Sequence, residues 1–309
     1  MTPAGTRSRP PKSTNDRFSG RALRAAFGLL ETTAPGLGAR MAERMFFRPP
    51  PSRVSPRVQS LLASARPFEV RFRGQALAAW SWGEGPRIIL VHGWGSRGGH
   101  MAAFVPRLLA AGFSAVAFDA PAHGASPGRT TNIPEIAGAL WAVSEATGPE
   151  PAAGAVAHSA GSVATAYALR HGLALGRAVL LSSAARPDAY AERFAQRLGL
   201  GPRQQAGLRA LSEKRLGLPW SALDVPTLVR DLEVPALIVH DEQDEDVPWR
   251  HGAEVAAAWP QARLVTTRGL GHHQVLRDPE VARHAVDFLR AGPGAAADPQ
   301  GEEVVHANG

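Results

Sequence analysis

Residues 153–171 read AGAVAHSAGSVATAYALRH. The stretch up to His158 is small and apolar, as in a strand that is buried on both faces, and the rest has the Ala-rich composition of a helix. A strand that runs through a serine turn straight into a helix is the setting of a nucleophile elbow. Because that turn is tight, the residues two before and two after Ser159 must be small, and they are Ala157 and Gly161. Ala157 stands where the motif usually has Gly, and it keeps the small volume. The pattern predicts an exposed serine at the carboxyl end of a strand.

Strand and helix signals alternate on both sides of this stretch. The strand-like runs are 67–72, 75–82, 87–92, 114–119, 153–158, 178–181, 235–240 and 263–267. The helix-like runs are 101–111, 133–146, 159–171, 252–259 and 279–289. This alternation predicts an α/β fold with a mostly parallel central sheet covered by helices on both faces, in which the first two runs form a hairpin. Residues 184–230 have no strand signal, and we expect them to form a short helical cap near the carboxyl edge of the sheet.

Composition excludes several classes of site. The chain of 309 residues has 34 basic and 27 acidic side chains and no Cys, so a disulfide, a thiolate nucleophile and a Cys-ligated metal site are excluded. Of the formal charge of +7, a net +5 lies in residues 1–24, and the remaining Arg residues are scattered, so we expect no nucleic-acid partner. No apolar run is long enough to span a membrane and no secretory signal is evident, which makes the cytoplasm the expected location.

The two ends differ in composition from the middle. Residues 1–20 are small, polar and basic, and residues 291–309 are small and polar, so both are expected to be disordered tails. Residues 21–66 are expected to be an N-terminal helical segment, because apolar residues recur at helical spacing in 22–30 and 37–47. We expect these helices to pack outside an α/β domain of residues 67–290; the alternative for 22–47 is a helix on a membrane surface. The oligomeric state is left open.

A nucleophilic serine needs a base and a carboxylate that orients the base. The favoured base is His272, because Gly269 and Gly271 give its loop freedom to place the ring over the sheet edge; His273 is the competing residue. The stretch 241–246 holds five carboxylates in six residues. Asp241 follows the strand most closely and Asp244 lies at the middle of the turn, so the residues alone leave the acid open between Asp241, Asp244 and Asp246.

Acyl transfer also needs backbone N–H groups that stabilise the oxyanion. One candidate is the amide of Ala160, at the start of the helix that follows Ser159. The other is the amide of Trp94, because Gly93 and Gly95 allow the backbone to approach closely. The alternative is a Gly-rich turn that binds no ligand.

Taken together, these stretches resemble the α/β-hydrolase superfamily over about residues 67–290. The resemblance is carried by His92-Gly93, the FDAPAHGAS stretch at 118–126, the Ser159 elbow, the 240–248 loop and Gly271-His272. The family loop His-Gly-x-x-Asp-x-x-Val-Pro implies that Asp244 is the acid, although Asp241 replaces its Gly and so remains an alternative. The resemblance further implies that Asp119 and His123 brace a loop rather than act in catalysis.

The resemblance implies a serine hydrolase with a helical cap. It would act on carboxylic esters through Ser159, Asp244 and His272, with an oxyanion hole at Trp94 and Ala160. The substrate would be a small-molecule ester or acyl compound, and no metal or other cofactor would be needed. The alternatives are an acyltransferase or thioesterase on the same scaffold and a non-catalytic binding protein. Apolar residues of the cap are either a pocket for an acyl or alkyl group or packing residues; they are Tyr190, Phe194, Leu198, Leu211, Leu218 and Trp220.

Overall fold

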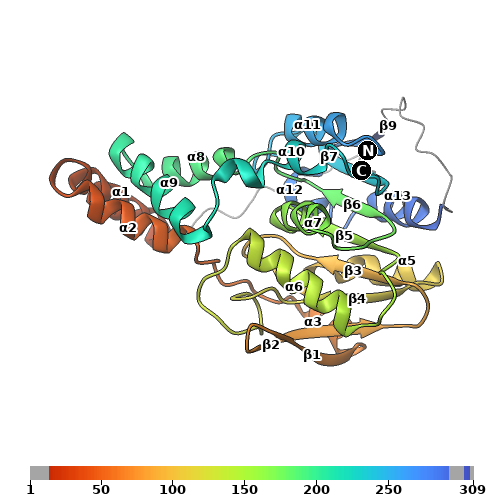
Figure 1. The fold of residues 1–309 in the computed structure, drawn as a ribbon. Coiled ribbons are helices and arrows are strands. Elements are labelled where there is room, and N and C mark those ends of the chain that lie inside the picture. The colour runs from red at the N-terminus through yellow and green to blue at the C-terminus, as the bar shows by residue number, and fades with distance from the viewer. Residues whose placement is uncertain (1–13, 292–302, 307–309) are drawn as a thin grey trace, which may run out of the picture. The chain divides into compact units, whose positions relative to one another are not determined.

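A single sheet organises the larger part of the chain. The computed structural model describes residues 14–291 and 303–306, and within them nine strands pair in the order β1-β2-β4-β3-β5-β6-β7-β8-β9 (Figure 1). The strands are β1 (Arg66–Phe72), β2 (Gln75–Trp82), β3 (Arg87–Val91), β4 (Ser114–Phe118), β5 (Gly154–His158), β6 (Ala178–Leu181), β7 (Ala236–Asp241), β8 (Ala262–Arg268) and β9 (Glu303–His306). The pairs β1–β2 and β2–β4 are antiparallel, and all the others are parallel. The expected mostly parallel α/β sheet is confirmed.

The expected hairpin forms at the edge of the sheet. Strands β1 and β2 pair from Arg66 opposite Ser81 to Phe72 opposite Gln75, which leaves a two-residue turn. Both turn residues, Arg73 and Gly74, have positive φ angles, of 47° and 76°. This is the backbone of a type I′ turn, whose twist matches that of the two strands it joins.

Two apolar layers cover the faces of the sheet. Alternate residues of the inner strands point to opposite layers, as Ile88 and Ile89 of β3 do. The helices of one layer are α6 (Ile133–Ala146), α7 (Ala160–Arg170), α10 (Val225–Val229) and α11 (Arg250–Ala258). Those of the other are α4 (Gly98–Met101), η1 (Ala102–Phe104), α5 (Val105–Ala110) and α13 (Pro279–Arg290). This α/β unit also holds α3 (Pro56–Ala63), η2 (Trp220–Leu223) and α12 (Gly271–Gln274).

The chain reverses its direction of travel across the sheet beside β3. Strand β4 lies on one side of β3, and the chain then returns to place β5 on the other side. In open α/β sheets such a point leaves a crevice outside the carboxyl ends of the strands, where ligands bind. The loops that follow β3 and β5 begin at His92 and Ser159, so the topology brings both to this crevice.

A second compact unit is built from two separate stretches of the chain, which among the described residues are 14–46 and 190–215. Its helices are α1 (Thr14–Thr33), α2 (Pro35–Phe46), α8 (Pro187–Leu198) and α9 (Pro202–Leu216). Phe27, Ala42 and Leu208 are among its buried core residues. The Glu31 carboxylate of α1 accepts the backbone N–H groups of Arg203 at 3.0 Å and Gln204 at 3.2 Å, and so caps the first turn of α9.

The outer segments depart in part from the expected organisation. Residues 1–13 of the expected N-terminal tail lie outside the described residues, whereas α1 already begins at Thr14. Of the expected C-terminal tail, residues 303–306 form β9, and residues 292–302 and 307–309 lie outside the description. The stretch 184–230 is helical, as expected, but only 190–215 belongs to the helical unit. Its placement as a cap over the site stays a prediction.

None of the described helices combines the length and the apolar character that a membrane span requires.

Candidate active site

The turn between β5 and α7 has the strained geometry of a nucleophile elbow. Ser159 has φ 53° and ψ −118°, in a region that residues with a side chain rarely occupy. A Cβ added to Gly161 would lie 2.6 Å from the carbonyl oxygens of both Val91 and His92, so only glycine fits there. Ala157 is fully buried. The small residues on either side of Ser159 are therefore required by close packing against β3 and the loop that follows it.

A continuous chain of hydrogen bonds links a serine, a histidine and an aspartate. The Ser159 hydroxyl donates to Nε2 of His272 over 3.1 Å, and Nδ1–H of His272 donates to Oδ2 of Asp244 over 2.8 Å. The three residues come from the ends of β5, β8 and β7, and 113 positions separate Ser159 from His272. This is the arrangement in which a histidine can take a proton from a serine while a carboxylate fixes the histidine tautomer.

Asp244 is held as a carboxylate by its surroundings. Burial raises the pKa of this group, but hydrogen bonds from His240 and His272 and from the amide of Val247 lower it more, so the pKa of Asp244 lies well below its usual range. Its second oxygen, Oδ1, accepts the N–H groups of Asp246 at 2.9 Å and Val247 at 2.7 Å. The ionised Asp244 is thus oriented by the turn in which it lies.

The other two candidate acids have different partners. Asp241 accepts the amide of Gln243 at 2.9 Å, the hydroxyl of Thr267 at 2.8 Å and the amide of Leu270 at 3.0 Å, and so joins the ends of β7 and β8. Asp246 is partly buried, with its carboxylate 3.7 Å from Nε2 of His273. Neither is hydrogen-bonded to His272. The structure therefore places Asp244, of the three, against the histidine ring.

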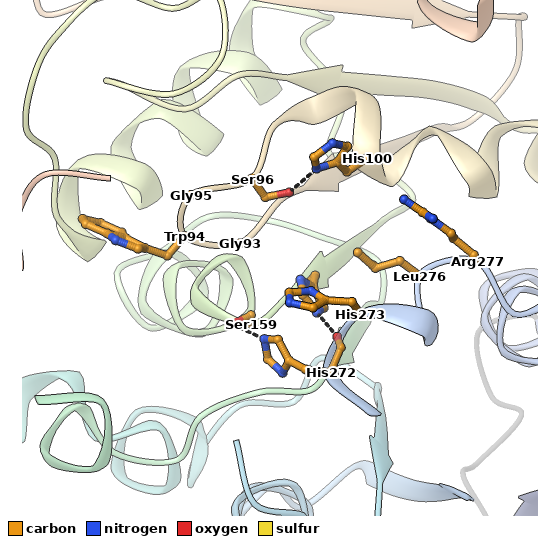
Figure 2. A pocket seen from close by; sticks show the side chains of 11 residues that line it. Gly93, Trp94, Gly95, Ser96, His100, Ser159, His272, His273, Leu276 and Arg277 are labelled. Atoms are coloured by element: carbon orange, nitrogen blue, oxygen red, sulfur yellow. Dashed lines mark hydrogen bonds between the residues drawn. The ribbon is translucent and has the colours of Figure 1, made fainter. Parts of the chain in front are cut away.

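His272 and His273 occupy different environments. The His272 side chain is 9% exposed and contacts both Ser159 and Asp244, whereas the His273 side chain is 68% exposed. Figure 2 shows His272 directed at Ser159 and His273 beside it on α12. Gly271, with φ 60°, begins this short helix after β8. The glycines in the loop thus give the freedom that positions the His272 ring.

The two expected oxyanion donors lie on the segments that flank the serine. The loop after β3 passes so close that a Cβ on Gly93 would lie 3.0 Å from the Ser159 Cβ. Trp94 follows in this loop, and Ala160 is the first residue of α7. Across residues 14–291, the backbone N–H groups of Trp94 and Ala160 donate no hydrogen bond to the protein. Both amides are therefore available to an oxyanion at Ser159.

Two buried histidines hold these loops in place. His92 donates from Nδ1 to the carbonyl of Gly93 at 2.8 Å and accepts the amide of Ala120 at 3.0 Å. His123 accepts the amide of Gly95 at 3.0 Å. Burial lowers the pKa of both rings, that of His92 to about 3, so each is neutral and can accept an N–H.

Asp119 supports the same group of loops as His92 and His123. It is fully buried, and its carboxylate accepts the amides of Gly98 and Ala125, each at 2.7 Å. These contacts connect the loop after β4 to the start of α4. Asp119 and His123 support the loops and do not contact Ser159 in the structure.

A pocket of about 260 Å³ opens at the serine (Figure 2). Ser159, His272 and Trp94 line it, together with Ser96, His100 and Arg277, which the sequence did not single out. All of its lining residues belong to the α/β unit. The cavity can therefore admit a small molecule next to the serine hydroxyl.

The residue before the serine has a role that the sequence reasoning missed. His158 is 3% exposed, and its Nε2 lies 2.8 Å from the backbone carbonyl of His272. Burial and then the adjacent His272 lower its pKa well below the usual value, so His158 is neutral and donates Nε2–H to that carbonyl. The only signal in the sequence is the position of His158 directly before the elbow serine.

Two family models match most of the chain between residues 86 and 300. One, described as alpha/beta hydrolase fold, matches residues 86–207, and the other, described as TAP-like protein, matches residues 219–300. A putative carbamate hydrolase, RutD, from Pseudomonas savastanoi pv. phaseolicola is 35% identical over 69 residues. The match spans 22% of this chain and only 27% of that relative's length.

Solved structures share the fold at low sequence identity. An esterase from Pyrococcus furiosus has a TM-score of 0.62 and 21% identity, over 79% of this chain and 97% of its own. A thermophilic esterase from Thermogutta terrifontis has a TM-score of 0.57 and 20% identity, over 73% of this chain and 98% of its own. The thioesterase domain of the curacin biosynthetic pathway has a TM-score of 0.56 and 15% identity, over 73% of this chain and 98% of its own. With these family matches, its elbow and its sheet order, the chain belongs to the α/β-hydrolase superfamily.

Proposed function

We propose that the protein hydrolyses carboxylic esters through an acyl-enzyme formed on Ser159. The observation that carries the proposal is the hydrogen-bond chain from Ser159 through His272 to Asp244, with distances of 3.1 and 2.8 Å. A serine hydroxyl is a weak nucleophile at neutral pH, and a base within hydrogen-bond reach overcomes this. Asp244 remains ionised and fixes the tautomer that leaves Nε2 of His272 free to accept the proton.

In the first half-reaction, Oγ of Ser159 bonds to the ester carbonyl carbon while its proton moves to Nε2 of His272. The carbonyl oxygen takes up the negative charge, which the amides of Trp94 and Ala160 stabilise. When the tetrahedral intermediate collapses, the bond to the alkoxy oxygen breaks, and His272 gives its proton to the departing alcohol. Asp244 stabilises the imidazolium between these two proton transfers.

In the second half-reaction, water takes the place of the alcohol. His272 removes a proton from the water as its oxygen bonds to the acyl carbon, and the same amides hold the second oxyanion. Collapse then breaks the bond to Oγ, which recovers its proton from His272, and the free acid leaves. All protons and bonds balance without a cofactor.

The same acyl-enzyme would form from other acyl donors. A carbamate, the substrate class in the name of the relative from Pseudomonas savastanoi, presents a carbonyl carbon to Ser159 in the same way. A thioester changes only the leaving group, and an acyltransferase changes only the acceptor. These alternatives are therefore distinguished by assay and not by the geometry at Ser159.

The test combines an activity-based probe with ester turnover. A fluorophosphonate should label the wild-type protein at Ser159, located by mass spectrometry of the labelled peptide, and should not label the S159A variant. p-Nitrophenyl acetate, butyrate and octanoate should be turned over by the wild type and not by S159A. Labelling that survives S159A overturns the choice of nucleophile. Labelling of Ser159 without ester turnover favours a thioesterase or acyltransferase, and absence of both favours a binding protein.

A further inference from the structure

We propose that Arg277 forms an anion-binding subsite in the pocket beside Ser159, and that the substrate is an ester that carries a carboxylate. The inference rests on the proposed ester hydrolysis and extends it to the class of acyl group. It is carried by the position of one cation among the residues that line the pocket and by the lack of a partner for its charge.

The turn between α12 and α13 holds the backbone of Arg277 at the rim, and the residue is exposed. Its backbone N–H donates to the carbonyl of Gln274 over 2.8 Å, and the adjacent Leu276 is only 7% exposed. The next residue, Asp278, turns its carboxylate to the start of α13, where it accepts the amides of Glu280 and Val281. In Figure 2, the Arg277 side chain extends across the rim toward His100.

The guanidinium of Arg277 has no carboxylate within ion-pair distance among the residues that the structure describes. In the described part of the chain it forms no ion pair, and no Asp or Glu is among the residues that line the pocket. Asp244 is shielded, since its side chain is fully buried behind His272. Asp119, also fully buried, is 3.4 Å from Arg97. Within the described residues, no carboxylate therefore pairs with the positive charge at the rim.

The wall opposite Arg277 is polar but neutral. Nε2–H of His100 donates to the carbonyl of Arg53 over 3.2 Å, which leaves Nδ1 to accept the Ser96 hydroxyl at 2.9 Å. Burial is the main cause that lowers the pKa of His100, and the charge of Arg277 lowers it further. Because His100 carries no charge, it supplies a polar surface and Arg277 supplies the attraction for an anion.

These features favour a carboxylate over an extended apolar chain. A guanidinium presents a planar pair of N–H groups that matches the two oxygens of a carboxylate. A cavity of about 260 Å³ holds a short acyl group with its ester carbonyl at Ser159 and its far end at the rim. The class of substrate that follows is a monoester of a short dicarboxylic acid.

Two p-nitrophenyl esters of equal chain length test this proposal on the full-length protein. The butyrate is neutral, and the mono-ester of succinate carries a terminal carboxylate. We expect the wild type to have the higher kcat/KM for the succinate. In R277Q the ratio of the two values should fall about 10- to 100-fold, mainly through KM, as for the loss of a charge-assisted hydrogen bond. The ratio for R277K should lie between the ratios for the wild type and for R277Q.

The matched control is R290Q. Arg290 is an exposed residue in the last turn of α13, outside the pocket, and its replacement changes the net charge by the same amount. Added NaCl should lower kcat/KM for the succinate and leave that for the butyrate unchanged. Equal kcat/KM values for both esters in the wild type, or the same change in R277Q and R290Q, overturn the subsite.

The proposed function and the subsite fail in different ways. Turnover of butyrate without preference for succinate overturns the subsite alone. If neither ester is turned over but Ser159 is labelled by the fluorophosphonate, a second measurement replaces turnover. It is the protection of Ser159 from labelling by free glutarate, a short dicarboxylate. Protection that is lost in R277Q supports the subsite, and no protection overturns it. Absence of both labelling and turnover overturns the function and the subsite together.

Discussion

The side chain before the nucleophile holds the backbone of the base: Nε2 of His158 is 2.8 Å from the carbonyl oxygen of His272. The two imidazole rings are also close, with centroids 4.8 Å apart. Ser159 and His272 are thus joined twice, once through Oγ and once through the residue next to the serine. The second link fixes α12 without occupying the nitrogen of His272 that accepts the serine proton.

Replacement of His158 should therefore impair the base. H158A should lower kcat about 10- to 100-fold, because a small displacement of a catalytic ring is costly, while H158Q, which keeps an N–H donor, should retain more activity. The second-order rate of fluorophosphonate labelling and the melting temperature are measured for both variants. If labelling falls equally in both, and in proportion to the loss of stability, His158 serves packing alone.

Three Asp to Asn variants should separate the three candidate acids. D244N should lower kcat about 10³- to 10⁴-fold with a stable fold, because the amide favours the wrong His272 tautomer. D241N should instead lower the free energy of unfolding by about 1–3 kcal/mol, since Asp241 joins the ends of β7 and β8. D246N should change little. Steady-state kinetics with urea unfolding checks all three, and full activity of D244N contradicts the assignment.

Gly161→Ala should damage both the site and the fold. The added methyl group would meet two backbone carbonyl oxygens at 2.6 Å, and neither can rotate away. We expect a loss of about 1–3 kcal/mol in the free energy of unfolding, with most of the activity lost. The matched control is Gly28→Ala in α1, where a Cβ meets nothing within 4 Å. That change should add about 0.5–1 kcal/mol of stability. Equal effects of the two changes would contradict the packing argument.

Stability should decline as the pH falls below about 6.5. The pKa of His92 is lowered by burial from 6.5 to about 3, so between these values the unfolded chain binds a proton that the folded chain does not. The stabilisation is complete above pH 6.5. At 1.36 kcal/mol per pH unit, His92 lowers the free energy of unfolding by at most about 3 kcal/mol between pH 6.5 and 4.5. Urea unfolding at several pH values in this range measures how the free energy of unfolding changes with pH.

The control for this pH dependence is H92Q. Glutamine can accept the amide of Ala120, as Nε2 of His92 does, but it does not titrate. H92Q should have a shallower pH slope than the wild type. The remainder should come from the other histidines whose pKa values are lowered by burial, which are His100, His123, His158 and His251. A slope identical to that of the wild type would assign the acid sensitivity to other groups.

The sequence was informative where a residue's neighbours along the chain determine its structure. The strands of the inner sheet were predicted because both of their faces are buried, which makes each a short apolar run bounded by turns. Ser159 and Gly161 were predictable for the same reason, since the elbow is a local turn. The pattern around Arg73-Gly74 likewise identified the hairpin.

What the sequence left open depends on contacts across long distances in the chain. Five adjacent carboxylates look alike, and only the path of the turn brings Asp244 rather than Asp241 to His272. The association of residues 190–215 with the N-terminal helices depends on packing such as that of Gln204, which is fully buried and donates to the carbonyl of Phe27 at 2.9 Å. Neither contact has a local signal.

The separation of Ser159 and His272 by 113 positions also bears on how the protein folds. The serine turn is local, because β5 and α7 are consecutive, whereas the base follows β8, three strands later in the sheet. Contacts between distant parts of a chain form slowly. After dilution from denaturant, helical circular dichroism should therefore recover before fluorophosphonate labelling does. Reactivity at Ser159 is thus a direct measure of completed folding.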